Sequence, residues 1–539
     1  MAAIAVMLGL VLTSCGTGVD EASTTPTEPT SNLVTSTGPP RTGGTLVFAL
    51  AAESNGWNTS FNQWGPSGLT VARTIFDTMA TFDADGNVKP FLLESFSSSD
   101  DFKTWTLKLR PGITFHNGKK VTAQTIVRNQ MFLKSSAQAG VLYKQIESFE
   151  AVDELTVRAH TSVPDTVFPM LLGSQLGVVV DPDWLESGDS LHPIGTGPFE
   201  LEDWSIGRKL VVKKNPNYWR KDAEGRALPY LDGIEFPVIT DTDAMSTALR
   251  AGDVDVIQST NTEQFDLFHS DPDTYQGYVV DRAQQPESAV ALNTSKAPFT
   301  DVDARRALAL ATDRKELLEL LGMSPEQETT GPFPTDSPFF AEVGFPAFDL
   351  DQAKRLVAGV KERHGSFSFT LMTTTDPFAT RLATMLQQQW QNAGIEVHIN
   401  NVDTAQMLIK VVTGDYQSAV WTASLAPDPR EEATAFWAPV VTPGELISLN
   451  LTRFDDERVR QAVDAAMATQ DPAKIKDQIT EIQRRFADQM PWIWLYRQPQ
   501  YIVANRTVVN LVNWTLPDGT PAQPLYRGGA MLAQAWIER

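Results

Sequence analysis

A strand–helix–strand pattern in the middle of the chain most constrains what it can fold into. The apolar segment Ile234–Ile239 is followed by a helical segment, Thr242–Ala251, and then by a second short apolar segment, Val254–Ile257. Asp241 or Thr242 suits the position before the first helical turn. A helix that connects two strands in this way indicates a right-handed β-α-β unit in a parallel or mixed sheet.

A second pattern of the same kind lies further along the chain. Ser366–Met372 alternates as a strand, Asp376 and a following proline begin a helix with an apolar stripe, and Ile395–Ile399 alternates again. Because the two units are independent of one another, they predict an α/β protein with two lobes.

The segment before the first unit predicts a β-hairpin. Phe199–Trp204 and Leu210–Lys214 alternate as strands, and residues 205–207 form the turn between them. Gly195 and Gly197 precede the hairpin. We expect positive φ angles there, which glycine adopts without steric cost.

Composition excludes some classes of partner and site. The chain has 539 residues, enough for more than one domain, and its net charge is −22. This acidity argues against a nucleic-acid partner and against binding of anionic lipid by the folded body. Cys15 is the only cysteine, so an intramolecular disulfide and a cysteine-based zinc site are excluded.

The N-terminus resembles a bacterial lipoprotein signal. Ala2–Thr13 is an apolar run too short to span a bilayer, and it leads into Leu-Thr-Ser-Cys, which ends at Cys15. No Lys or Arg precedes the run. We expect residues 1–14 to be a lipoprotein signal peptide and Cys15 to carry the lipid. The alternative is a buried cysteine in an ordinary apolar segment.

The segment after Cys15 has the composition of a linker. Residues 16–44 are rich in Thr, Ser, Pro and Gly and contain few large apolar side chains. Such a segment cannot bury enough surface to fold. We therefore predict a lipid-anchored disordered tether over residues 15–44, with the membrane reached only through the anchor.

A polar, glycine-rich loop follows the first strand of the folded part. The strand is Thr45–Ala51, and the loop carries Glu53, Asn55, Trp57 and Trp64. Loops that follow strands are where α/β proteins place their ligands, so we expect these four residues to bind a ligand. The alternative for the tryptophans is packing in the local core.

The order of motifs along the chain resembles one family. The hairpin segment contains G-T-G-P-F, N-P-N-Y-W and L-D-G-I-E-F, and further matches lie on both sides of it. They are Pro90, Leu93, Glu94, Ser95, Leu109, Arg110, Pro111, Gly112, Phe115, His116, Gly118, Thr122, Ala123, Ala251–Asp255, Val290–Asn293, Lys296–Phe299, Asp301 and Arg305–Leu308. Together they resemble the family-5 extracytoplasmic solute-binding proteins of ABC importers, the dipeptide- and oligopeptide-binding group.

The resemblance implies an α/β, two-lobed periplasmic-binding-protein-like fold of class II, in its large three-subdomain form, with mixed sheets and two interlobe crossings. We expect lobe I at residues 45–292 with an inserted subdomain at residues 88–190. Lobe II is expected at 293–497, and the chain returns to lobe I at 498–539. A helix over Asp301–Leu321, capped by Thr300, follows the first crossing.

The resemblance also implies a ligand site. Peptide binders of the family carry a run W-x-(A/G)-D that closes with D-P, and its first aspartate grips the α-ammonium group of the peptide. Trp421–Pro429 resembles this run, with Trp421 facing the ligand, but Ser424 stands in place of the aspartate. Asp428 or Glu53 is then the candidate acceptor for the amine.

The function implied is that of a substrate-binding lipoprotein of an ABC importer. It would capture a peptide or related oligomeric solute between its lobes, with Asn293 and Tyr496 of the crossing strands at the ligand, and deliver it to permease subunits. We expect a monomer held outside the cytoplasm at the outer face of the cell membrane. One alternative is a sugar or other non-peptide solute in the same fold. Another is an extracytoplasmic hydrolase or glycan-binding surface protein.

Catalytic and metal-binding motifs do not favour an enzyme. None of the six histidines forms H-E-x-x-H or a similar metal-ligand spacing, and the chain contains no G-x-S-x-G. We therefore expect a binding protein without catalytic residues, metal or cofactor.

Overall fold

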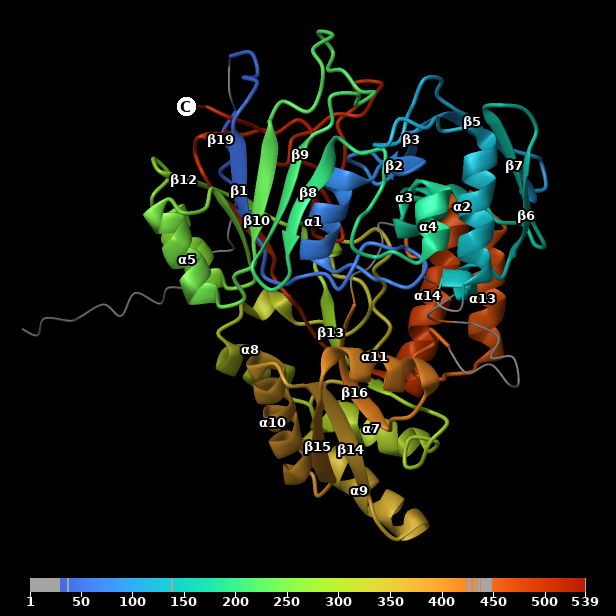
Figure 1. Cartoon of the computed structure of the whole chain (residues 1–539). Coiled ribbons are helices and arrows are strands. Elements are labelled where there is room, and N and C mark those ends of the chain that lie inside the picture. Colours follow the sequence, from blue (N-terminus) through green and yellow to red (C-terminus); the bar gives the residue numbers. More distant parts are fainter. Residues whose placement is uncertain are drawn as a thin grey trace, which may run out of the picture.

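The computed structural model describes residues 30–35, 38–136, 139–423, 428–430, 433, 437 and 448–538. The chain folds into two lobes, with lobe I at the top of Figure 1 and lobe II at the bottom, which confirms the predicted two-lobed α/β fold. The predicted signal peptide, Cys15, Ser424 and much of the predicted tether lie outside the described residues.

Lobe I is built on a mixed sheet with the strand order β12-β18-β11-β1-β10-β9-β8. The central strand β1 runs parallel to β10 and β11. The strands are β1 (Thr45–Ala49), β8 (Phe199–Ser205), β9 (Lys209–Lys214), β10 (Gly233–Pro237), β11 (Val256–Ser259), β12 (Tyr275–Val279) and β18 (Tyr501–Asn505), and the sheet packs against helices α1 (Pro66–Ile75), α5 (Thr242–Ala251) and α6 (Thr262–His269). The predicted hairpin is β8–β9. The first predicted β-α-β unit is β10–α5–β11, with β1 lying between its two strands.

An aspartate occupies the N-cap position of most of the longer helices. Its carboxylate accepts a hydrogen bond from a backbone amide in the first helical turn, which the helix itself leaves unpaired. Asp241 caps α5 in this way, as predicted, by accepting from the amide of Ala244 at 2.7 Å. The same residue type caps helices of lobe II at Asp301, Asp313, Asp349, Asp376, Asp403, Asp456 and Asp471.

The glycines before the hairpin are required by close packing and not by positive φ. Neither Gly195 nor Gly197 has a positive φ angle, so that expectation is wrong. A Cβ atom on Gly195 would lie 2.2 Å from the carbonyl oxygen of Ile75, and one on Gly197 would lie 2.4 Å from the carbonyl carbon of Ile75. The end of α1 therefore passes directly over these two residues.

The aromatic pair after the hairpin is anchored to a buried carboxylate. Tyr218 donates its hydroxyl to Oδ1 of Asp77 at 3.1 Å, and Trp219 donates Nε1 to Oδ2 at 2.9 Å. The amide of Asp77 donates to the hydroxyl of Thr196 at 3.4 Å. Burial raises the pKa of Asp77 to about 6. The G-T-G-P-F and N-P-N-Y-W motifs thus converge on one residue just after α1.

An inserted subdomain has its own antiparallel sheet with the order β4-β5-β7-β6. Thr122 begins its main helix with a reciprocal capping arrangement with Thr125, at the predicted helix start. The strands are β4 (Leu93–Ser98), β5 (Thr104–Leu109), β6 (Ile146–Ala151) and β7 (Thr156–Thr161), the helices are α2 (Ala123–Ser135), α3 (Phe168–Gly173) and α4 (Pro182–Ser187), and the hairpin β2 (Ala80–Phe82) and β3 (Val88–Pro90) leads into the subdomain.

Lobe II is built on a mixed sheet with the order β15-β14-β16-β13-β17. The second predicted β-α-β unit is β14–α10–β15, whose strands are parallel neighbours. The strands are β13 (Glu287–Leu292), β14 (Ser368–Thr374), β15 (Glu396–Val402), β16 (Ser418–Ala423) and β17 (Trp492–Arg497), and the helices are α7 (Val302–Ala311), α8 (Arg314–Leu321), α9 (Leu350–His364), α10 (Pro377–Asn392), α11 (Thr404–Thr413), α13 (Glu457–Met467) and α14 (Pro472–Gln489).

The helix predicted over Asp301–Leu321 is broken into α7 and α8. Thr312 has extended backbone angles, and the carboxylate of Asp313 accepts from the amide of Glu316, so that a new helix begins there. The N-cap of α7 is Asp301 rather than the predicted Thr300. Local capping by aspartate outweighs the continuity of the apolar pattern at this position.

The two crossings between the lobes lie side by side. The chain passes from β12 to β13 and returns from β17 to β18. The amide of Val280 donates to the carbonyl of Gln500, and the amide of Gln498 donates to the carbonyl of Pro286. The predicted lobe boundary after Leu292 is too late, because β13 lies inside the sheet of lobe II. The first crossing therefore precedes Glu287.

Part of the predicted tether is docked on lobe I. The amide of Asn32 donates to the carbonyl of Gly277 in β12 at 2.9 Å, and Gly277 donates back to Oδ1 of Asn32 at 2.5 Å. Val34 donates its amide to Gln276 at 2.9 Å. This differs from the prediction of disorder up to residue 44. The physical reason is that β12 is an edge strand with backbone groups free to pair.

The C-terminal segment packs back onto lobe I. Trp514 and Trp536 are 4% and 3% exposed, as expected of core residues. The short strands of this segment are β19 (Val508–Val509), β20 (Leu525–Tyr526), β21 (Gly529–Ala530) and β22 (Trp536–Ile537).

Candidate functional site

Two tryptophans flank an alanine on one face of the sheet of lobe II. Trp421 of β16 and Trp494 of β17 both pair with Ala289 of β13, which lies between them. Directly paired residues of antiparallel strands share a face. Trp494 is 6% exposed and stacks on Trp492, with ring centroids 5.6 Å apart, whereas Trp421 is only partly buried. Trp421 is therefore the accessible member of this aromatic face.

The same face carries a buried ion pair beside the crossings. Glu287 opens β13 opposite Arg497 of β17, with Nη2 of the arginine 3.0 Å from Oε2 of the glutamate. Arg497 also donates to the carbonyl oxygens of Gln285 and Pro332. The two side chains are 3% and 1% exposed, and burial raises the pKa of Glu287 to about 7 and lowers that of Arg497.

Sequence reasoning missed this ion pair, although the sequence carries a signal for it. Each crossing strand is almost wholly apolar and contains a single charged residue, Glu287 in the first and Arg497 in the second. A charged side chain in a buried strand requires a partner of opposite sign. Each of these two strands supplies the counter-charge for the other.

Asp428 is engaged within the protein. Its Oδ1 accepts from Nε of Arg430 at 3.0 Å and its Oδ2 accepts from Nη2 at 2.5 Å. The side chains of Asp428 and Arg430 are 14% and 9% exposed. A carboxylate held by a guanidinium in this way is not available to a ligand amine unless the pair opens.

Glu53 ties the loop after β1 to the hairpin of lobe I. Its Oε1 accepts from Nε1 of Trp204 at 2.7 Å, and its Oε2 accepts from the amide of Gly207 at 2.8 Å. Asn55 is exposed and accepts at Oδ1 from Asn62 at 3.0 Å. In Figure 1 this loop runs along the side of lobe I that faces lobe II.

Trp57 and Trp64 lie in the core of lobe I. In this structure both indoles therefore follow the alternative of packing in the local core. They are 1% and 7% exposed. Trp57 packs against Trp204 with ring centroids 5.6 Å apart, and Trp64 stacks on Phe76 at 5.7 Å. The exposed aromatic residue of the loop is Phe61, which is 46% exposed and which sequence reasoning missed.

Asn293 and Tyr496 are also buried inside lobe II. Asn293 lies beyond the end of β13 that is farther from the crossings, and its side-chain Nδ2 donates to the carbonyl oxygen of Tyr416 at 2.9 Å. Its Oδ1 accepts from the hydroxyl of Ser295 at 2.7 Å. Tyr496 is 2% exposed, and burial raises its pKa to about 12. Neither side chain is therefore available to a ligand in this structure.

Fewer of the predicted ligand-binding residues are accessible than the sequence suggested. Trp421 lies near the crossings, because it belongs to the carboxyl end of β16, which pairs with Glu287 at the start of β13. The loop after β1, which carries Glu53 and Asn55, runs along the side of lobe I that faces lobe II. The position of Ser424 is outside the described residues.

A comparison with models of protein families gives a match over much of the chain. The model for bacterial extracellular solute-binding proteins, family 5 (middle), matches residues 87–440, which is more than half of the chain. The chain belongs to this family.

Curated relatives of this solute-binding protein include the glutathione-binding protein GsiB of Salmonella paratyphi A. That protein is 26% identical over 467 residues, which cover 83% of this chain and 88% of the relative.

Solved structures share the two-lobed fold. AgaA from A. tumefaciens R10, in complex with agropinic acid, matches with a TM-score of 0.80 and 25% identity over 92% of this chain and 99% of that one. The oligopeptide-binding protein AppA of Bacillus subtilis, in complex with a nonapeptide, matches in fold with a TM-score of 0.77 and 20% identity over 93% and 100% of the two chains.

Two further properties of the solute-binding protein concern membranes and metals. Among the described residues, no helix combines the length and the apolar character that crossing a bilayer requires. Within the same part of the chain, His, Cys, Asp and Glu side chains form no group of three or more that could hold a metal ion.

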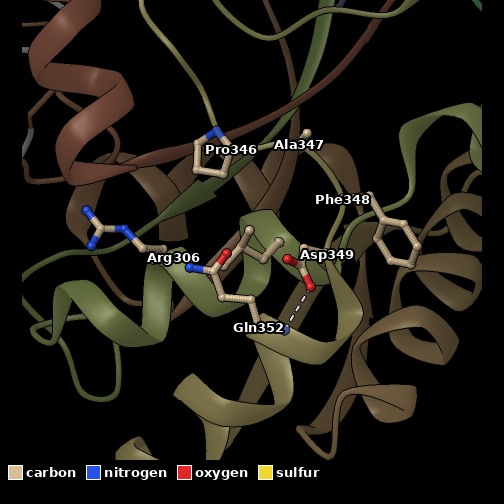
Figure 2. Close-up of a pocket in the computed structure, with 7 residues that line it drawn as sticks. Arg306, Pro346, Ala347, Phe348, Asp349 and Gln352 are labelled. Carbon is tan, nitrogen blue, oxygen red and sulfur yellow. Dashed lines mark hydrogen bonds between the residues drawn. The ribbon is translucent and has the colours of Figure 1, made fainter.

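A surface groove of about 520 Å³ lies on lobe II between α7 and the start of α9 (Figure 2). Arg306 and Phe348 lie on opposite sides of it in this view, and Asp349 accepts from the amide of Gln352 at 2.8 Å to cap α9. It is lined by Arg306, Leu310, Pro346, Ala347, Phe348, Asp349 and Gln352. None of the residues predicted to bind ligand lines this groove.

Proposed function

We propose that this protein is the solute-binding component of an ABC importer, which captures a peptide or related solute between its two lobes and delivers it to a membrane permease. The observation that carries the proposal is the pair of adjacent crossings, hydrogen-bonded to one another between β12–β13 and β17–β18. Two short segments side by side form a natural hinge, about which the lobes close on a ligand.

The proposed ligand site has one half on each lobe. Trp421 supplies an accessible indole from lobe II, and Asn55 and Phe61 supply exposed side chains from the loop of lobe I. Aromatic side chains contribute much of the binding energy in buried interfaces, because they bury a large area at low entropic cost.

A second candidate is a solute that has no free α-ammonium group. It is favoured by the engagement of both nominated carboxylates, since Glu53 is bonded to Trp204 and Gly207, and Asp428 is bonded to Arg430. An amine would have to displace these donors before it could be gripped.

The finer parts of the proposal concern the anchor and the oligomeric state. We place a lipid on Cys15, which would hold the protein at the outer face of the cell membrane, and we propose that the folded body acts as a monomer. Labelling of cells with a fatty-acid analogue tests the lipid, and substitution Cys15→Ser should abolish the labelling.

Thermal unfolding with paired solutes tests the function and separates the two candidates. We would compare glutathione, agropinic acid, oligosaccharides and short peptides, each peptide with a free and with an acetylated N-terminus. A ligand at 100 times its Kd stabilises the folded state by about 2.7 kcal/mol. Loss of the shift on acetylation supports amine recognition, whereas equal shifts support the second candidate. No shift with any solute, or breakdown of the solutes by the purified protein, contradicts the proposal.

We expect Trp421→Ala to weaken the binding of any solute found in this way by about tenfold or more. Phe348→Ala is the matched control, because this residue is an exposed aromatic of lobe II outside the proposed site. Isothermal titration of both variants checks the expectation. An unchanged Kd for Trp421→Ala would remove this residue from the site.

A further inference from the structure

The inserted subdomain and lobe II contact one another away from the crossings. The loop 165–167 between β7 and α3 meets the residues at the end of α13. Thr166 donates its amide to the carbonyl of Met467 at 3.1 Å and its hydroxyl to the same carbonyl at 2.9 Å. The hydroxyl also lies 3.2 Å from the carbonyl of Thr469. Figure 1 shows α13 of lobe II beside this subdomain, on the right of the molecule and away from β13.

The loop is held firmly on the subdomain side. Trp105 donates Nε1 to the carbonyl of Asp165 at 3.2 Å, and the carboxylate of Asp165 accepts from the amide of Val167 at 3.0 Å. Val167 itself is 6% exposed and packs in the hydrophobic core of lobe II. This loop of the inserted subdomain thus reaches into the hydrophobic core of lobe II.

Arg430 completes the contact from lobe II. Its Nη1 donates to the hydroxyl of Thr166 at 3.2 Å and to the carbonyls of Thr469 at 2.9 Å and Ala466 at 3.3 Å. Its other nitrogens are held by Asp428. The planar guanidinium therefore joins three segments, and the carboxylate of Asp428 fixes its orientation.

We propose that Thr166 and Arg430, with Asp428 as the positioning residue, form an interlobe latch that holds lobe II closed against the inserted subdomain. The adjacent crossings join the lobes on one side of the molecule, so a contact on the other side opposes the hinge opening. Asp428 then acts in closure and not in amine recognition. The latch itself does not depend on the proposed function. Only the statement that closure captures a solute rests on it.

The latch is tested without ligand, so that its failure is distinguishable from failure of the proposed function. We would introduce Val152→Cys and Ile409→Cys, at side chains that are 47% and 62% exposed, into the full chain with Cys15→Ser, and measure the distance between spin labels at these sites. Arg430→Ala should lengthen the mean distance and broaden its distribution. Arg430→Lys keeps the charge but lacks the planar guanidinium with its several donors, and it should give a mean distance between those of the wild type and Arg430→Ala.

Two further variants keep the test decisive. Arg485→Ala is the matched control, because Arg485 makes a similar ion pair with Asp456 wholly inside lobe II, with Nη2 2.6 Å from Oδ2. It should leave the distance unchanged. Thr166→Val removes the hydroxyl at constant shape and should shift the distance in the same direction as Arg430→Ala, even if the latter folds poorly. If both latch variants fold and give the wild-type distribution, the latch does not exist and the two bodies move together without it.

Discussion

Replacing Glu287 with alanine is expected to lower the free energy of unfolding by about 3–5 kcal/mol, because it leaves the guanidinium of Arg497 buried without a counter-charge. Arg497 is 1% exposed, so water cannot replace the lost carboxylate. The two residues belong to the crossing strands, and the loss should therefore appear in the unfolding of lobe II. Urea unfolding followed by tryptophan fluorescence measures it, since Trp492 and Trp494 lie on the same strand as Arg497.

The matched control is Glu235→Ala in lobe I. Glu235 of β10 pairs with Lys209 of β9 at 2.9 Å, again between adjacent antiparallel strands, but the side chains are 39% and 32% exposed. Exposed pairs contribute about 0–1 kcal/mol, so this variant should unfold almost as the wild type does. The double variant Glu287→Met/Arg497→Met should be more stable than Glu287→Ala, because it removes both charges. Equal small losses in Glu287→Ala and the control would contradict this account.

Replacing Asp77 with alanine is expected to cost about 3 kcal/mol or more of unfolding free energy. The hydroxyl of Tyr218 and the indole nitrogen of Trp219 would both lose their acceptor in a buried site, at about 1–3 kcal/mol for each unpaired donor. Asp77→Asn keeps the size and one acceptor oxygen and should cost less. Thermal and urea unfolding of the two variants provides the comparison, with the exposed Asp203→Ala as control.

The ionisation of Asp77 gives this prediction a second readout. Burial raises its pKa in the folded protein from 3.8 to about 6, so the folded state favours the protonated carboxyl. The resulting stability is fully present below the unfolded pKa and is lost as the pH rises through about 6. The wild type should therefore gain about 2 kcal/mol relative to Asp77→Asn between about pH 7 and about pH 4. A difference that does not vary with pH would show that the carboxyl titrates as in the unfolded chain.

The elements that depend on short-range patterns were predictable from the sequence. The β8–β9 hairpin, the β14–α10–β15 unit and the cap at Asp241 all follow from alternation, helical periodicity and capping within a few residues. The motif order in addition pointed to the family, which the family model then showed. Where two local signals competed, as at Thr312 and Asp313, the prediction of one continuous helix failed.

The candidate site depended on pairings that no local pattern contains. Glu53 meets Trp204 at a separation of 151 residues, Glu287 meets Arg497 at 210, and Arg430 meets Thr166 at 264. Each pairing decides whether a polar or charged side chain is free for a ligand or already satisfied, yet each arises only when segments far apart in the sequence pack together.

The sequence by itself thus determined the α/β class, the two lobes and the family, because alternation, helical period and motif order are properties of neighbouring residues. The tertiary structure alone decided that Trp57 and Trp64 belong to a core, that β13 belongs to lobe II, and that Glu53 accepts from Trp204. The physical reason is that burial and charge pairing are set by which distant segments share a volume, and a carboxylate or an indole looks the same in the sequence whichever side of a sheet it reaches.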